Sequence, residues 1–421
     1  MEHRERFIAD GYVREAVPDA KLGSALEVFF ISTGTMCGLP GYALSAQITG
    51  ALGFSGARTA FVCAGVICCV LASLTSYVGA RTRMNLAIMS DHAFGTAGGR
   101  IVKTVIAVTL LGWVAVILSV FGTMFGDAIS RIYNIEVPAA VIEAIAAATI
   151  ATVTLRGVRG LESVGKLIAP TLAILLVWTL YHGCPGASGE LSQSIVPTMS
   201  IGAAISAVVG GFIVGILIQP DYARFVRHPT RAGIASGIAL GVAFPLILTF
   251  TALPVARCSA PNLIAVMVMA GVGLPALMLL ALGALIDGGA SLYSGSLSLT
   301  NEVKRFRLPW VVTSAAAGGL LLALLHAENY YLPFLSTLGV ALPPVGALLV
   351  LHMLTLWRRR ANSGNSVPLE RIRLSAIIAW VGGTVVGYLG MRGVVTLTGI
   401  AALDSIGAAA VIWTIGRLGA R

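Results

Sequence analysis

The sequence predicts an all-α polytopic membrane protein with twelve transmembrane helices. Of its 421 residues, 57% are hydrophobic and only 11% are charged, and the mean hydropathy is +0.90. These values lie far outside those of ordinary soluble domains. Apolar runs long enough to cross a hydrocarbon core of about 30 Å recur along the whole chain. The expected spans are residues 24–45, 58–80, 102–126, 136–154, 161–182, 199–219, 232–255, 262–300, 309–327, 329–354, 374–391 and 394–416.

The positions of the basic residues predict the orientation of these spans. If the N-terminus is cytoplasmic, 24 of the 28 Lys and Arg residues fall in cytoplasmic segments, and only Arg58, Arg131, Arg257 and Arg392 fall outside. This asymmetry predicts a multi-pass protein of the cytoplasmic membrane with both termini in the cytoplasm. It also accounts for the net charge of +10, so we expect lipid and not nucleic acid as the surrounding partner.

The chain is expected to form a single domain, residues 1–421. Helix 1 contains the glycine- and proline-rich run S-T-G-T-M-C-G-L-P-G at residues 32–41, and helix 6 contains V-V-G-G-F-I-V-G at residues 208–215. Interrupted first and sixth helices predict a five-plus-five inverted repeat with its site at the bilayer midplane. Packing faces of small residues are the alternative explanation for these glycines. The expected divisions are a cytoplasmic N-terminal segment, the two repeats and two further helices: 1–23, 24–182, 199–354 and 374–416.

One carboxylate, Asp287, stands in the apolar segment A-L-G-A-L-I-D-G-G-A-S-L-Y-S-G-S-L. An ionised acid near the bilayer centre costs about 2.5 kcal/mol or more unless water, a cation or a proton attends it. The two glycines that follow weaken the helix, so we expect a break that handles the coupling ion. Asp287 either binds Na⁺ as a metal ligand or carries H⁺. We expect Gly34 and Gly38 of helix 1 and Gly283 of helix 8 beside the ion, and Gly34 beside the substrate as well.

Two aromatic residues are candidates for binding a flat ligand. Trp113 lies mid-span, away from the interfaces where membrane tryptophans usually gather. Phe212 directly follows Gly210 and Gly211 at the expected break of helix 6. Each alone is explained as a core aromatic. Together they predict a planar substrate held between aromatic faces, next to Gly211.

Other polar residues have weaker patterns. Asp221 and Arg224 close helix 6 and predict a gate or a packing pair, and Ser336 on helix 10 is placed to reach the substrate from an outer gate. Glu143 in helix 4 is expected to pair with a polar neighbour or to lie near the outer surface.

The sequence shows none of the residue patterns that we associate with catalysis. The six cysteines show no metal-ligand spacing with histidine, and no nucleophile with a base and no phosphate loop is visible. We therefore expect neither an enzyme nor a bound cofactor. Only Cys184 and Cys258 fall in predicted outside loops, where either a disulfide or two free thiols fit the sequence.

Several motifs, spread in order over nearly the whole chain, resemble those of the nucleobase–cation symporter family of the purine/cytosine permease type. They are Y-V-G-A-R-T-R-M-N-L-A-I-M-S-D-H-A-F-G after helix 2, G-W at 112–113, G-V-R-G-L-E-S-V at 157–164, P-D-Y-A-R-F-V-R at 220–227, L-Y-S-G-S-L at 292–297 and F-L-S-T-L-G-V-A-L-P-P-V-G at 334–346. The resemblance implies a leucine-transporter-type fold of five-plus-five helices with two more at the C-terminus. It also implies a monomer that imports a nucleobase or related heterocycle by alternating access, coupled to a cation.

The resemblance further implies that the substrate lies between the aromatic positions Trp113 and Phe212. The chain departs from the family at two places. Leu110 stands near where cytosine permeases have a glutamine, and I-D-G-G-A replaces T-T-N-D-N, so that Gly288 takes the place of a substrate-facing asparagine. These departures make cytosine one candidate beside purines, hydantoin or allantoin, and thiamine-precursor pyrimidines. A membrane sensor that binds such a ring without transporting it is the other alternative.

Overall fold

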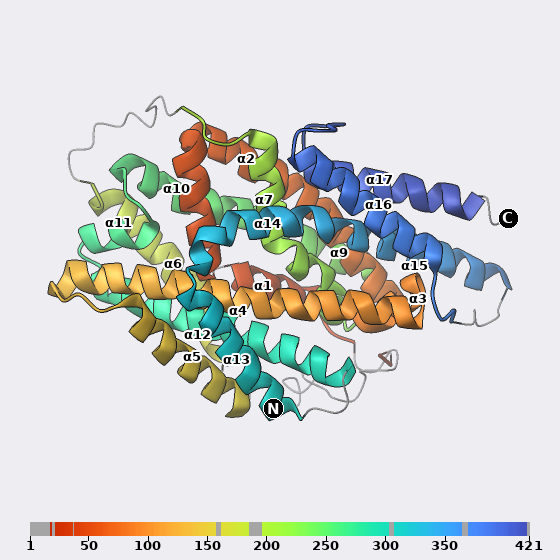
Figure 1. Ribbon diagram of the computed structural model, residues 1–421, viewed down its shortest axis with the longest axis horizontal. Helices are drawn as coiled ribbons and strands as arrows, with labels where there is room; N and C mark the ends of the chain where they lie inside the picture. The colour runs from red at the N-terminus through yellow and green to blue at the C-terminus, as the bar shows by residue number, and fades with distance from the viewer. Residues whose placement is uncertain are drawn as a thin grey trace.

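A computed structural model describes residues 17–18, 22–36, 38–156, 161–184, 196–302, 307–363 and 369–418. Within these residues the regular secondary structure is helical, apart from one isolated bridge between Gly23 and Val226 (Figure 1). The all-α prediction is therefore confirmed. The helices in chain order are α1 (Ala25–Met36), α2 (Leu39–Thr82), α3 (Leu86–Phe94), α4 (Thr96–Tyr133), α5 (Ala139–Arg156), α6 (Leu161–His182), α7 (Ile201–Leu217), α8 (Gln219–Ala223), α9 (Pro229–Ile238), η4 (Ala239–Ala243), α10 (Phe244–Cys258), α11 (Leu263–Met269), α12 (Gly273–Glu302), α13 (Leu308–Leu324), η5 (Ala327–Tyr330), α14 (Tyr331–Ala341), α15 (Pro343–Ser363), α16 (Leu374–Met391) and α17 (Ala401–Leu418).

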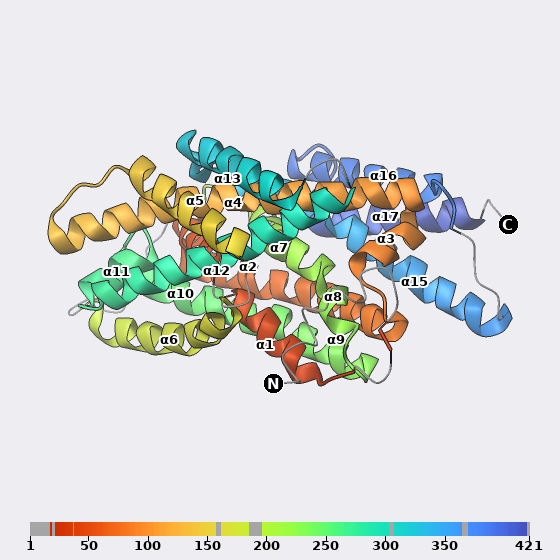
Figure 2. The ribbon, with the colours of Figure 1, turned by 90° about the horizontal axis from the view of Figure 1, so that it is seen from below.

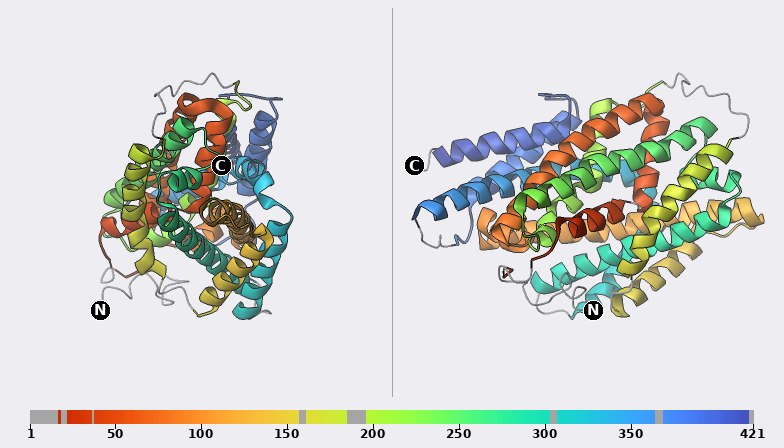
Figure 3. Two further views of the ribbon diagram at one scale, coloured as in Figure 1. Left: turned by 90° about the vertical axis from the view of Figure 1, so that its left-hand side faces the viewer. Right: turned by 180° about the vertical axis from the view of Figure 1, so that it is seen from behind.

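The long helices run mostly along one axis of an elongated bundle (Figures 1 and 2). Helices α6, α10 and α11 gather at one end, whereas α15, α16 and α17 lie toward the other (Figures 2 and 3). Within the described ranges, eight helical segments are long and apolar enough to cross a membrane, and three shorter apolar helices accompany them. The chain is a multi-pass membrane protein.

Helix α2 joins the expected first and second spans. It contains 44 residues and bends at Gly53, whose φ of 71° and ψ of 170° lie outside the helical region. Only glycine adopts this positive φ without a steric penalty. Beyond the bend, α2 exposes valines spaced four residues apart, as a lipid-facing stripe requires: Val62, Val66 and Val70.

The interruption of helix 1 lies within the expected run, but the interruption of helix 6 does not. Helix α1 ends at Met36, and α2 begins after Gly38, whose backbone is extended at φ −76° and ψ 156°. Helix α7, by contrast, passes through Gly210 and Gly211 and ends only at Leu217. A Cβ atom on Gly210 would collide with the backbone of α14, so this glycine permits a close helix crossing. The expected break at residues 208–215 is wrong.

Helix α12 is also continuous through Asp287 and the two glycines after it, so the expected break there is wrong. Gly288 faces α5 and α4, and a Cβ atom on it would lie 2.7 Å from the Ile150 side chain. The glycine therefore gives α5 room to pack. In both helices the sequence shows a small residue, but only the packing shows whether the helix breaks there.

The open question about the cysteines is answered by a disulfide. Cys184 and Cys258 are bonded, with their Cα atoms 5.8 Å apart. The bond joins the end of α6 to the end of α10.

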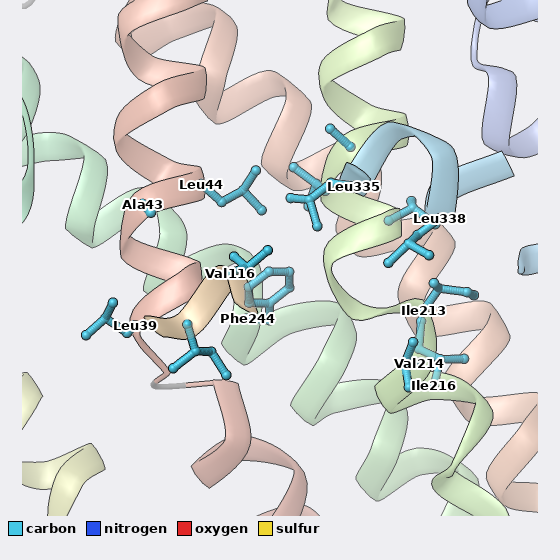
Figure 4. Close-up of a cluster of buried hydrophobic side chains, with 14 of the residues drawn as sticks. Leu39, Ala43, Leu44, Val116, Ile213, Val214, Ile216, Phe244, Leu335 and Leu338 are labelled. Carbon is cyan, nitrogen blue, oxygen red and sulfur yellow. The ribbon is translucent and has the colours of Figure 1, made fainter. Parts of the chain in front are cut away.

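The core lies where α2 and α7 meet α4, α10 and α14. Figure 4 shows buried hydrophobic side chains that these helices contribute to it. Its labelled members are Leu39, Ala43, Leu44, Val116, Ile213, Val214, Ile216, Phe244, Leu335 and Leu338. This packing fixes the helix ends beside which the candidate site lies.

Candidate functional site

A cavity of about 1220 Å³ enters the bundle between α3, α4, α7, α8 and α12. The α4 residues that line it recur every three or four positions and so share one helix face: Thr96, Arg100, Lys103, Ile106, Leu110 and Trp113. None of the α4 residues beyond Trp113 lines the cavity. The cavity therefore extends about 25 Å along α4, at 1.5 Å per residue, and ends at Trp113. We call the end near Thr96 the mouth and the end at Trp113 the closed end.

Aromatic side chains close the inner end of the cavity. Tyr331 and Phe334 of α14 meet Trp113 edge to face, with ring centroids 6.1 and 5.7 Å from the indole. The buried Tyr331 hydroxyl donates a hydrogen bond of 2.7 Å to the carbonyl oxygen of Pro40. Tyr331 thus connects α14 to the interruption of helix 1. The local sequence, Y-Y-L-P-F at residues 330–334, gave no sign of this contact.

Both helix interruptions border the cavity. Gly38 precedes α2 and Ile218 precedes α8, and both residues line it. Each of the two following helices carries a proline in its first turn, Pro40 or Pro220. The ends of broken helices leave backbone N–H and C=O groups without intrahelical partners. At Ile218 the backbone N–H bonds to Val214 and the C=O accepts from Asp221, so the unpaired backbone groups suited to ions and polar ligands belong to the interruption of helix 1.

Asp287 lines the cavity from α12, and a row of hydroxyl groups continues from it. The row has helical spacing on the same face: Ser291, Ser294 and Ser298. Asp287 was predicted from the sequence, whereas these serines were missed although their spacing from Asp287 was visible. Gly283 and Gly288 do not line the cavity, and Gly288 contacts the α5 side of α12.

The two candidate aromatics enter the cavity from different helices. Trp113 comes from α4, one turn after Leu110, and Phe212 comes from α7 beside Gly211. The ring of Phe212 lies against the buried Phe244 of α10, with centroids 3.6 Å apart. The structure thus brings four expected residues to one cavity: Leu110, Trp113, Gly211 and Phe212.

The remaining expected residues are divided between the cavity wall and other places. Asp221 lines the cavity, and its Oδ1 accepts a 2.7 Å hydrogen bond from the backbone N–H of Leu86 at the start of α3. Arg224 does not line it and donates from Nε to the backbone oxygen of Asp221 at 3.2 Å. Ser336 does not line it either. Gly34 belongs to α1, and its surroundings lie outside the described part of the chain.

Gln219 was not predicted, yet it joins several helices at the cavity wall. Its buried Oε1 accepts hydrogen bonds from Ser32 Oγ at 3.2 Å and from Ser236 Oγ at 2.8 Å. Its Nε2 donates to the backbone oxygen of Gly215 at 3.1 Å. Gln219 therefore ties α8 to α1, α9 and α7.

The mouth is charged. Lys103 and Asp91 form an ion pair of 3.1 Å, and His92 and Arg100 line the same region. Deeper in the cavity, the α12 wall carries one charged group, Asp287. The arrangement is chemically suited to a flat ring with a polar edge and to a small cation.

Comparison with known proteins confirms the family resemblance. Residues 17–416 match the sequence profile of the family described as permease for cytosine/purines, uracil, thiamine, allantoin. The cytosine permease of Escherichia coli (strain K12) is 23% identical over 381 residues, which are 88% of this chain and 87% of that protein. The same values hold for the cytosine permease of Escherichia coli O157:H7.

Solved structures share the fold. Mhp1 in its inward-facing conformation superposes with a TM-score of 0.80 at 18% identity, over 96% of this chain and 93% of Mhp1. Mhp1, a nucleobase-cation-symport-1 family transporter, in a closed conformation with bromovinylhydantoin bound gives 0.75 at 18% identity, over 95% and 93%. MhsT in complex with L-phenylalanine gives 0.57 at 17% identity, over 95% and 99%.

The sequence relatives are permeases, which confirms that the chain is a transporter and not an enzyme. Because the profile match covers nearly the whole chain, this protein belongs to the family of permeases for cytosine/purines, uracil, thiamine and allantoin.

Proposed function

We propose that this permease is a secondary active transporter that imports a nucleobase or related planar heterocycle together with H⁺ or Na⁺. The observation that carries the proposal is one cavity that contains Trp113, Phe212 and Asp287 from three different helices. Its volume of about 1220 Å³ holds a small ring and water. No cofactor takes part in this chemistry, which consists of binding and movement.

The aromatic faces support a planar substrate. Stacking of a base on an aromatic side chain contributes about 1–3 kcal/mol and tolerates different rings. Leu110 offers no hydrogen bond to a ring edge, so polar recognition falls to Asp287, Gln219 and the helix ends. This supports a range of rings, with cytosine and purines, hydantoin or allantoin, and thiamine-precursor pyrimidines as candidates.

Asp287 is proposed as the coupling group. It borders the same cavity as Gly38, next to the end of α1, whose last carbonyl groups have no intrahelical donors. A carboxylate with such oxygens binds Na⁺, and a carboxyl group at this depth carries H⁺. Gly34 is retained as a neighbour of the ion, on helix 1.

The helices support twelve spans in a five-plus-five inverted repeat followed by two helices. The eight long segments and three shorter ones become twelve when α2 is divided at Gly53. The interruptions at Gly38 and Ile218 fall in the first and sixth spans of this count. The proposed repeats are residues 24–182 and 199–354.

We propose that the mouth faces the cytoplasm and that the described conformation faces inward. The mouth contains Arg100 and Lys103 of a predicted cytoplasmic segment. The Cys184–Cys258 disulfide lies at the ends of α6 and α10, in predicted outside loops, as an oxidising outer side favours. Both termini are then cytoplasmic in an inner-membrane protein, which we propose to be a monomer.

The test is uptake of labelled cytosine, hypoxanthine, hydantoin and a thiamine-precursor pyrimidine into proteoliposomes under an imposed Na⁺ or pH gradient. Asp287→Asn should abolish accumulation against the substrate gradient and preserve binding in a thermal-shift assay. The control is Asp127→Asn, which changes an exposed acid on α4 away from the cavity and should accumulate substrate normally. Accumulation by Asp287→Asn refutes the coupling role. Binding without uptake by the unaltered protein favours the sensor.

A further inference from the structure

The side-chain amide of Gln219 has a fixed orientation at the cavity wall. Helix α7 ends at Leu217, so the carbonyl group of Gly215 belongs to its last turn, where helical carbonyls lack intrahelical donors. Gln219 Nε2 donates to the oxygen of this carbonyl at 3.1 Å. Because a carbonyl oxygen only accepts hydrogen bonds, the atom that faces it is the amide nitrogen and not the amide oxygen.

Serine hydroxyl groups occupy the amide oxygen of Gln219. Its Oε1 accepts from Ser32 Oγ at 3.2 Å and from Ser236 Oγ at 2.8 Å. Ser76 Oγ donates to Ser236 Oγ at 2.6 Å, which leaves the Ser236 proton for Oε1. An amide oxygen has two lone pairs, and the two serines use both. Gln219 therefore offers no acceptor to a ligand.

The amide nitrogen of Gln219 retains one donor. It has two N–H groups, of which one binds the oxygen of Gly215 and the other has no acceptor within the part of the chain that the structure describes. Gln219 lines the cavity and is 1% exposed. A buried donor without an acceptor is unfavourable, so an acceptor on a ligand in the cavity would stabilise the complex.

The cavity wall beside this amide has room for a ring. Gly215 lines the cavity, and a Cβ atom on it would meet nothing within 4 Å. Gly211, Gly215 and Gln219 recur every four residues on the wall, and Phe212 is one turn before Gly215. A flat ring on Phe212 therefore has space to extend along the wall toward the Gln219 amide.

We infer that Gln219 is a specificity-determining residue, whose remaining N–H donates a hydrogen bond to a carbonyl oxygen on the edge of the transported ring. This role rests on the proposed function and narrows the substrate class to oxo-heterocycles, such as uracil, cytosine, hypoxanthine and hydantoin. A ring that presents an amino or N–H group at this edge sets a donor against a donor and is disfavoured.

Binding of matched oxygen and sulfur rings to the intact purified protein tests this role. The pairs are uracil with 2-thiouracil and with 4-thiouracil, hypoxanthine with 6-mercaptopurine, and hydantoin with 2-thiohydantoin. A thiocarbonyl group preserves the planar ring and accepts hydrogen bonds more weakly than a carbonyl group. In calorimetric titrations, the unaltered protein should bind at least one oxygen ring about 2- to 13-fold more tightly than its sulfur analogue, the ratio for one neutral hydrogen bond.

Two variants separate recognition from support of the fold. Gln219→Met retains the length of the side chain without the amide and should bind both members of that pair with equal affinity. Ser236→Ala removes a hydrogen bond to Oε1 away from the cavity, so it should lower the melting temperature and preserve the preference for the oxygen ring. A preference that survives in Gln219→Met, or that Ser236→Ala abolishes, refutes the role.

The unaltered protein alone also decides the question, even if Gln219→Met does not fold. If it binds oxygen rings without preference over all their sulfur analogues, the role of Gln219 is refuted and the proposed function stands. If it binds none of these rings, the proposed function is refuted together with this role.

Discussion

The hydrogen bond from Tyr331 to Pro40 gives a prediction that isolates one atom. Tyr331→Phe removes the hydroxyl that joins α14 to the first turn of α2 and preserves the ring that meets Trp113. The hydroxyl is buried, with the residue 1% exposed, so water does not replace the lost contact in the closed arrangement. The variant should open the closed end more often.

The magnitude follows from one buried, neutral hydrogen bond. Such a bond contributes about 0.5–1.5 kcal/mol net. The carbonyl oxygen of Pro40 is in the first turn of α2, so a backbone N–H of the same helix can still donate to it. The variant therefore does not leave a buried acceptor unsatisfied, and no further free-energy cost is added. Converted to an equilibrium constant, the expected shift toward the open arrangement is about 2- to 13-fold.

Exchange rates of backbone amides in α14 measure this shift, because in the rapid-closing regime they scale with the open population. Tyr330→Phe is the matched control, since Tyr330 is adjacent, is 68% exposed and has a hydroxyl group that makes no hydrogen bond within the described residues. Equal exchange in Tyr331→Phe and Tyr330→Phe would refute the view that this bond holds the closed end.

Three other changes have definite expected outcomes. Trp113→Ala should weaken substrate binding by about 1–3 kcal/mol in a calorimetric titration, and unchanged affinity would make Trp113 a core residue only. Gly210→Ala should lower the melting temperature, because the new methyl group meets the backbone of α14. Gly215→Ala in the same helix is the control, because its methyl group meets nothing within 4 Å. Equal decreases in melting temperature would contradict the close helix crossing. Cys184→Ser should destabilise the protein by up to about 4 kcal/mol, the loop-entropy value for a separation of 74 residues, and an unchanged denaturation curve under non-reducing conditions would show that the bond with Cys258 adds no stability.

The sequence was sufficient for the helical membrane class, because hydropathy over about 20 residues reports the bilayer directly. It also singled out Asp287 and Trp113, which line the cavity, since a lone carboxylate and a mid-span indole are unusual in such segments. These signals depend on the residue and its immediate neighbours along the chain.

Other features depend on partners that are distant in sequence. Gly210 and Gly288 were expected at helix breaks, but their contacts with α14 and α5 show that they provide space for packing. Tyr331 was missed because its partner Pro40 is 291 residues away, and Gln219 because Ser32 is 187 residues away. Composition and local spacing contain no information about such pairs.

The disulfide between α6 and α10 has a mechanical consequence. It fixes two helices to each other at one end, and these helices belong to different proposed repeats. Any rotation between them must then pivot near Cys184, and displacement increases with distance from the pivot. Helix α6 has 22 residues, or about 33 Å, so a tilt of roughly 10° moves its far end by about 6 Å. A covalent joint at one end thus converts a small angular change into a large opening at the other.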